Sequence, residues 1–196
     1  MKHHVPAQGF TLVETMVAIT ILAFALVGPF TAVQTALSNS YLARDQLTAA
    51  SLAQEAQEYI ISIRDNNYLA TPRRGWLDGF NSATQGRNRC YGAYNATVTG
   101  FCTVDPTLGD FHVSGSASAM VGYTSAQASS IVPLYISSGN MYQQTAVGTR
   151  SKFTRTVRIQ ELTNTNDEVR VTVVVSWTTA NKPYSITVVN TLRDWL

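Results

Sequence analysis

Charged residues are scarce in this sequence. Asp, Glu, Lys and Arg make up 13% of its 196 residues, where about a quarter is usual in soluble proteins. The shortage has a clear location, because no charged side chain lies between Glu14 and Arg44. The formal net charge is only +2, so composition alone gives no support for a nucleic-acid-binding protein.

Residues and motifs for common catalytic chemistry are also missing. His112 is the only histidine beyond the first four residues, and the sequence has no Gly-x-Ser-x-Gly, phosphate-binding loop or dinucleotide fingerprint. Asp105 and Asp110 flank a loop that suits calcium weakly and an ordinary turn better. We therefore expect no enzymatic activity, no cofactor and no metal site.

A long apolar run is the most informative feature that is present. It begins at Phe10 and continues to about Leu37, which exceeds the ~20 residues that a membrane-spanning helix needs. A secretory signal peptide would have a shorter apolar core with its cleavage site afterwards, whereas here Gln8 and Gly9 come before the run. A plain membrane anchor would explain the length of the run but not the acid within it.

That acid is Glu14, the fifth residue of the run. A carboxylate near the bilayer centre costs about 3 kcal/mol unless it finds a partner. If the chain were cut between Gly9 and Phe10, the new amino terminus would lie one helical turn from Glu14. The ammonium of Phe10 in one copy could then pair with Glu14 of a neighbour, which would fix register more than it would add stability.

The segment Gly9-Phe10-Thr11-Leu12-Val13-Glu14 resembles the signature of type IV prepilins and type II secretion pseudopilins. That family has a short basic leader, a glycine before the cleaved bond, a phenylalanine after it and a glutamate as the fifth mature residue. The resemblance implies that a prepilin peptidase removes residues 1–9 and that Phe10 is N-methylated. It also implies assembly with other pilin or pseudopilin subunits through the N-terminal helix.

One position departs from the family pattern. Many members carry a helix-bending proline about two residues further along than Pro29 of this chain. We still expect Gly28-Pro29 to bend or locally melt the helix, because proline removes one backbone hydrogen bond and clashes with the preceding turn.

The whole sequence predicts an α+β, pilin-like fold, with a long N-terminal helix packed on a C-terminal antiparallel β-meander. The helix is expected over about 10–65, a length of about 80 Å. One face of its second half is apolar: Leu42, Ala49, Leu52, Ala53, Ala56, Ile60 and Ile63. We divide the chain into a leader (1–9), a membrane or filament-core half-helix (10–40), an amphipathic half-helix (41–66) and a β-rich head (67–196).

Three strands are expected near the C-terminus, at Phe153–Leu162, Glu168–Thr178 and Tyr184–Leu192. The loop Thr179–Pro183 is short enough to make the last two antiparallel. Alternation places one set of side chains on a common face: Val169, Val171, Val173, Val175 and Trp177. Further short strands are expected within 91–104 and 131–136, with loops elsewhere in 91–150. For 114–130, a surface loop and a low-complexity linker are equally good interpretations.

Two further features belong to the head. Arg73, Arg74, Arg87 and Arg89 surround Trp76 and Phe80, so a basic aromatic patch for nucleic acid is a weak hypothesis beside ordinary solvated loop charges. Cys90 and Cys102 are either free thiols or a disulfide. Export favours the disulfide, which would contribute about 3 kcal/mol by closing a short loop.

These features together indicate a structural subunit of a type IV pilus or type II secretion pseudopilus, and the extended strands favour a minor subunit. The alternative is a membrane-anchored binding module whose head recognises DNA, a surface or a secreted substrate. In either case we expect a single pass through the cytoplasmic membrane with the head outside the cytoplasm. The filament subunit would then move into a surface or periplasmic filament.

Overall fold

The computed structural model describes residues 9–110, 119–165 and 167–194. Its main helix, α1, is continuous over Leu12–Leu69. The chain forms two compact units, residues 1–45 and 46–196, and α1 contributes to both. The α+β, pilin-like architecture predicted from the sequence is confirmed.

The first unit holds the apolar part of α1. Every residue from Gly9 to Tyr41 is exposed, and the most apolar 18-residue window has a mean hydropathy of 2.2 with none of it buried. By length and composition α1 is able to cross a membrane. The helix runs through Gly28 and Pro29 without interruption, so no local melting accompanies the proline, and a bend there stays a prediction.

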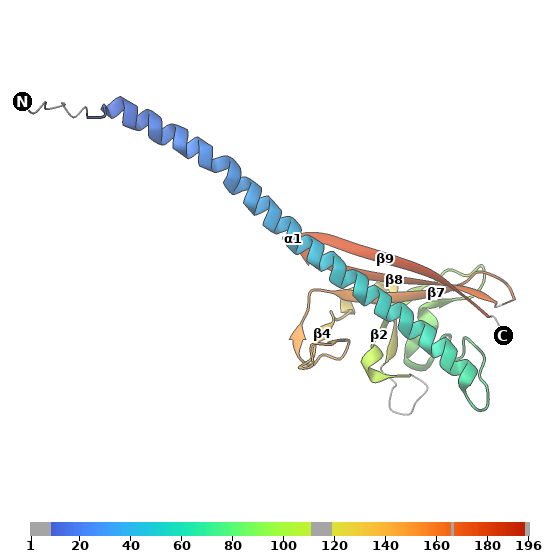
Figure 1. The fold of residues 1–196 in the computed structure, drawn as a ribbon. Coiled ribbons are helices and arrows are strands. Elements are labelled where there is room, and N and C mark those ends of the chain that lie inside the picture. The colour runs from blue at the N-terminus through green and yellow to red at the C-terminus, as the bar shows by residue number, and fades with distance from the viewer. Residues whose placement is uncertain (1–8, 111–118, 166, 195–196) are drawn as a thin grey trace, which may run out of the picture. The chain divides into compact units, whose positions relative to one another are not determined.

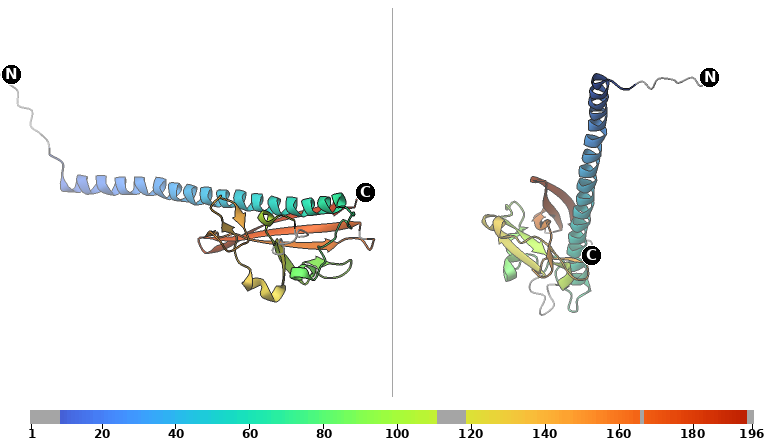
Figure 2. Two further views of the ribbon diagram at one scale, coloured as in Figure 1. Left: turned by 90° about the horizontal axis from the view of Figure 1, so that it is seen from below. Right: turned by 90° about the vertical axis from the view of Figure 1, so that its left-hand side faces the viewer.

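The second unit begins with the remainder of α1, which buries one stripe of side chains. Spacings of three and four residues place this stripe on a single face: Ala49, Leu52, Ala53, Ala56, Tyr59, Ile60 and Ile63. The predicted apolar face is confirmed from Ala49 onwards, whereas Leu42 is half-buried. Tyr59 was not foreseen. Figure 2 shows this part of α1 lying along one face of the strands.

The main sheet has six strands. Its bounds are β1 Tyr91–Gly92, β2 Gly100–Val104, β3 Met120–Thr124, β7 Thr154–Glu161, β8 Glu168–Thr179 and β9 Lys182–Arg193. The hydrogen-bonded order is β3-β2-β7-β8-β9, with β1 pairing parallel to β7. Strands β7, β8 and β9 form the predicted antiparallel meander, drawn in orange to red in Figure 1.

The alternation predicted for β8 is confirmed. Its inward side chains are all buried against the core: Val169, Val171, Val173, Val175 and Trp177. The turn into β9 is tighter than predicted, since only Ala180 and Asn181 lie outside the two strands. Both have positive φ, 49° and 61°, as the two-residue turns that match strand twist require.

The segment between the disulfide loop and β7 contains more structure than its composition suggested. Strand β3 and the short helix η3 (Ser125–Ser130) lie within 114–130, so both the surface-loop and the linker interpretation are wrong for β3, and the linker interpretation is also wrong for η3. A small second sheet adds β4 Tyr135–Ile136, β5 Tyr142–Gln143 and β6 Thr149–Arg150. The remaining short helices are η1 Thr84–Arg89 and η2 Pro106–Leu108.

The disulfide between Cys90 and Cys102 is present, and both cysteines are fully buried. It joins the end of η1 to β2, which pairs with both β3 and β7. The covalent bond therefore ties the loop after α1 to the interior of the sheet.

Candidate assembly site

The N-terminus of α1 is set by Thr11. The Thr11 hydroxyl accepts a hydrogen bond from the backbone N–H of Glu14 at 3.2 Å, and the Thr11 carbonyl accepts one from the N–H of Thr15 at 3.1 Å. This is the pattern of a helix N-cap. Gly9 and Phe10 precede the helix and are exposed, so the bond between them lies in accessible, non-helical chain where a peptidase could bind it.

Glu14 occupies the first turn of α1. A negative charge there is favoured by the partial positive charge at a helix N-terminus. Among the described residues Glu14 takes part in no ion pair, and its side chain is exposed. The carboxylate is thus available to a cation outside its own folded chain, and its role in assembly stays a prediction.

Threonines along the apolar helix satisfy their hydroxyl groups locally. Each donates to a carbonyl three or four residues earlier, at 2.8–2.9 Å: Thr15 to Leu12, Thr20 to Val17, Thr31 to Gly28 and Thr35 to Thr31. A polar group left unpaired in hydrocarbon is costly, and these bonds remove that cost. The sequence analysis overlooked this feature, although four threonines in an uncharged apolar run were its visible signal.

Gly28 and Pro29 lie in the middle of the exposed part of α1. A Cβ atom added at Gly28 would meet no heavy atom within 4 Å, so nothing in the isolated chain requires a glycine there. A shallow apolar groove next to them is lined by Leu26, Val27, Phe30, Thr31 and Gln34. This surface is without a partner in the monomer among the described residues.

The basic aromatic patch predicted for 70–90 is not formed. Trp76, Phe80 and Arg87 are buried, since the loop folds back over the end of α1. The Asn67 side-chain amide fixes the loop by donating to the carbonyls of Trp76 and Asp78 at 3.3 and 3.2 Å. The prediction is wrong because these rings close the core, and they are not available to stack on bases.

Asp105 and Asp110 bond to different parts of the chain. The buried Asp105 carboxylate accepts from the backbone N–H groups of Thr107, Gln144 and Thr145, at 2.8–3.2 Å, and from the hydroxyls of both threonines. The ordinary turn is therefore the correct interpretation. Within the described residues no group of three or more His, Cys, Asp or Glu could hold a metal; His112 lies outside that part of the chain.

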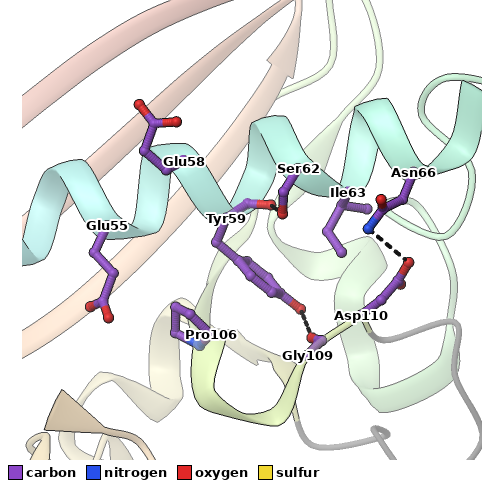
Figure 3. A pocket seen from close by; sticks show the side chains of 9 residues that line it. All are labelled: Glu55, Glu58, Tyr59, Ser62, Ile63, Asn66, Pro106, Gly109 and Asp110. Atoms are coloured by element: carbon purple, nitrogen blue, oxygen red, sulfur yellow. Dashed lines mark hydrogen bonds between the residues drawn. The ribbon is translucent and has the colours of Figure 1, made fainter. Parts of the chain in front are cut away.

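A groove of about 410 Å³ lies between α1 and the loop that ends at Asp110. Figure 3 shows Tyr59 reaching across it, where its hydroxyl donates to the Gly109 carbonyl at 3.0 Å. Asn66 donates to the Asp110 carboxylate at 3.4 Å. Burial raises the pKa of the Tyr59 phenol, with a smaller contribution from the Asp110 charge, so the phenol keeps the proton that it donates to Gly109.

Comparison with known proteins supports the N-terminal assignment and nothing beyond it. Searches of curated proteins and of solved structures gave no match. A family described as the prokaryotic N-terminal methylation motif matches residues 6–28, the stretch that contains Gly9, Phe10 and Glu14. The chain therefore carries the N-terminal motif of a type IV pilin-like or pseudopilin-like precursor, consistent with the prepilin-like family.

Proposed function

We propose that this protein is a structural, non-catalytic filament subunit. A prepilin peptidase cuts the chain after Gly9, the new terminus at Phe10 is N-methylated, and α1 then packs beside the helices of other pilin or pseudopilin subunits. Before assembly the apolar helix holds the chain in the cytoplasmic membrane, with the head outside the cytoplasm. The long β8–β9 hairpin favours a minor subunit over a major one.

A single observation supports this proposal most strongly: an unpaired Glu14 lies one turn from the predicted cleavage site, on a helix whose next charged residue is Arg44. In a lone membrane helix that carboxylate would cost about 3 kcal/mol. Pairing with the ammonium of a neighbouring Phe10 offsets that cost and defines how far one helix slides along the next. A membrane anchor without assembly has no use for the acid.

Substitution of Glu14 tests the proposal. We expect Glu14→Ala to remove the chain from sheared filaments while leaving its amount in the membrane nearly unchanged, because only the contact between subunits is lost. Thr20→Ala is the matched control, since it removes a polar group from the same exposed helix without removing charge. Immunoblots of the filament and membrane fractions measure both.

The alternative, an anchored binding module, makes the opposite prediction. Its Glu14→Ala variant would behave like Thr20→Ala in every fraction. That result would leave α1 as an anchor and transfer the function to the head.

A further inference from the structure

The main sheet protects one of its edges and exposes the other. Strand β3, at the first edge, has only five residues and is covered by η1. The Arg89 guanidinium donates to the Gly122 carbonyl at 3.3 Å, and a Cβ atom at Gly122 would collide with the Gly86 carbonyl oxygen. The backbone of η1 therefore lies directly against β3 at Gly122, and Arg89 occupies a carbonyl of that short strand.

The opposite edge is strand β9, which pairs with β8 alone within the described part of the chain. All twelve residues pair in unbroken register, from Lys182 opposite Thr179 to Arg193 opposite Glu168. No bulge interrupts the strand. Figure 1 shows β9 as a long outer strand of the meander.

Natural sheets guard such edges with charges, prolines or bulges, because unpaired backbone groups attract other strands. In β9 the charges and the proline stand only at the ends, at Lys182, Pro183 and Arg193. The intervening residues are uncharged and rich in β-branched side chains: Tyr184, Ser185, Ile186, Thr187, Val188, Val189, Asn190, Thr191 and Leu192. This edge therefore lacks the usual protection along its centre.

The turn determines which backbone groups of β9 point outward. A two-residue turn makes Thr179 and Lys182 a hydrogen-bonded pair, so every second residue from Pro183 directs its backbone groups away from β8. Pro183 fits this alternation, because a residue without an N–H is tolerated on the free side of an edge strand. Ser185, Thr187 and Val189 then present outward N–H and C=O groups, whereas the outward N–H of Thr191 donates to the Asn190 side chain at 2.8 Å.

We propose that the free edge of β9 is a docking site for an extended segment of another polypeptide, which adds to the sheet as a further strand. Free alternating N–H and C=O groups are satisfied along their whole length only by another extended backbone. The Lys182 cation at one end and the uncharged centre favour an incoming strand that is uncharged in the middle and acidic towards Lys182, since Arg193 at the other end already pairs with Glu168 at 3.3 Å. This surface is in the head, and its use is additional to assembly through α1.

A second copy of the same chain is the weaker occupant. Gln57 donates to the Val188 carbonyl at 3.3 Å, and Tyr68 donates to the Asp194 carboxylate, so α1 and β9 run in the same direction. Antiparallel pairing of two β9 edges would reverse one helix relative to the other. Subunits that pack their α1 helices in parallel, as the proposed function requires, exclude that arrangement. Parallel pairing of two β9 edges would place the Lys182 side chains of the two copies beside each other, where like charges repel. A separate polypeptide is therefore the favoured partner.

The test uses the full chain in detergent and a fluorescent peptide with the sequence of β8, residues 168–179, which already matches β9 on its other side. Fluorescence anisotropy measures its binding to the wild type, Thr187→Pro and Thr187→Ala. Proline removes the outward N–H and leaves the β8 pairing intact, whereas alanine keeps that N–H. Intrinsic tryptophan fluorescence, measured before the peptide is added, checks that each variant is folded, because Trp76 and Trp177 are both buried. If Thr187→Pro does not fold, Val189→Lys replaces it, because a charge on the exposed face guards the edge without changing the backbone.

We expect saturable binding that weakens about tenfold in Thr187→Pro and changes by less than about twofold in Thr187→Ala. Absence of saturable binding, or equal binding to all three chains, would overturn the proposal. So would self-association of the wild type that Thr187→Pro abolishes, because the occupant would then be a second copy. None of these results depends on cleavage at Gly9 or on Glu14, so failure here leaves the proposed function intact.

Discussion

The two ends of helix α1 are built for different surroundings. From Leu12 to Tyr41 its apolar side chains are exposed, and its one acid has no partner among the described residues. From Ala49 onwards the same helix buries a continuous stripe in the head. The head thus buries its own apolar side chains, whereas those of the first part of the helix stay exposed. The exposed apolar side chains of α1 and the acid among them are the features on which the proposal of assembly depends.

Substitution of Arg155 tests most strongly whether contacts within the head stabilise its fold. Its side chain is fully buried, donates to the carbonyls of Leu52 and Val104 at 3.0 Å each, and pairs with Glu55. We expect Arg155→Ala to lower the free energy of unfolding by about 3 kcal/mol, because it leaves buried acceptors unpaired. Denaturant unfolding of the full chain in detergent measures it. Arg158→Ala, exposed on the same strand, is the control, and equal losses in both would contradict the account.

The disulfide gives the next largest effect. The double substitution Cys90→Ser and Cys102→Ser is expected to cost about 3 kcal/mol, because it releases a short closed loop in the unfolded chain. Reduction of the wild type should lower its thermal midpoint to that of the double variant. A reduced wild type as stable as the oxidised form would show that the bond adds nothing to the sheet.

Matched valines compare the two regions directly. Val173 in β8 is fully buried and Val27 in α1 is 59% exposed. Truncation of Val173 to alanine should cost about 2 kcal/mol through lost burial and a cavity, whereas Val27→Ala should change the unfolding of the head by less than about 0.5 kcal/mol. Intrinsic tryptophan fluorescence during denaturation, to which the buried Trp76 and Trp177 both contribute, reports both. A large effect of Val27→Ala would mean that the exposed helix supports the head.

Tyr59 gives the smallest effect and a pH dependence. Tyr59→Phe should cost about 1 kcal/mol by removing its bond to Gly109. Burial raises the pKa of Tyr59 in the folded chain above its ordinary value of 10.0, so the unfolded chain loses the proton first as pH rises. The contribution of Tyr59 to the free energy of unfolding is therefore constant below about pH 10 and falls above it. In Tyr59→Phe this fall should shrink, and an unchanged pH profile would exclude Tyr59 as its source.

The sequence predicted what depends on local pattern. The apolar run predicted where α1 begins, to within two residues, and that Glu14 is the one charged residue in it. The period-two alternation of β8 predicted the meander and its buried face. Strand β3 was missed because five residues in a stretch rich in small and polar side chains show no clear period. Its place in the sheet depends on pairing with β2, and no local pattern in residues 120–124 predicts that pairing.

The weak hypothesis of a basic aromatic patch within 70–90 was wrong for a related reason. The loop after α1 has the composition of a binding patch, but its fold over the end of α1 buries Arg87, Trp76 and Phe80. Composition cannot show which side of a loop faces the core. Asp105 is also fixed by contacts that the sequence does not show. The backbone N–H groups of Gln144 and Thr145, which donate to its carboxylate, come from far along the chain, and no sequence pattern relates them to it.

The intact mass and N-terminal sequence of the protein recovered from membranes or sheared filaments test the central proposal most directly. We predict a chain that begins at Phe10 and is heavier by one methyl group than the plain cleavage product. A chain that retains residues 1–9, or one cut after the apolar run, would contradict the proposal and leave a plain anchor or a secreted head.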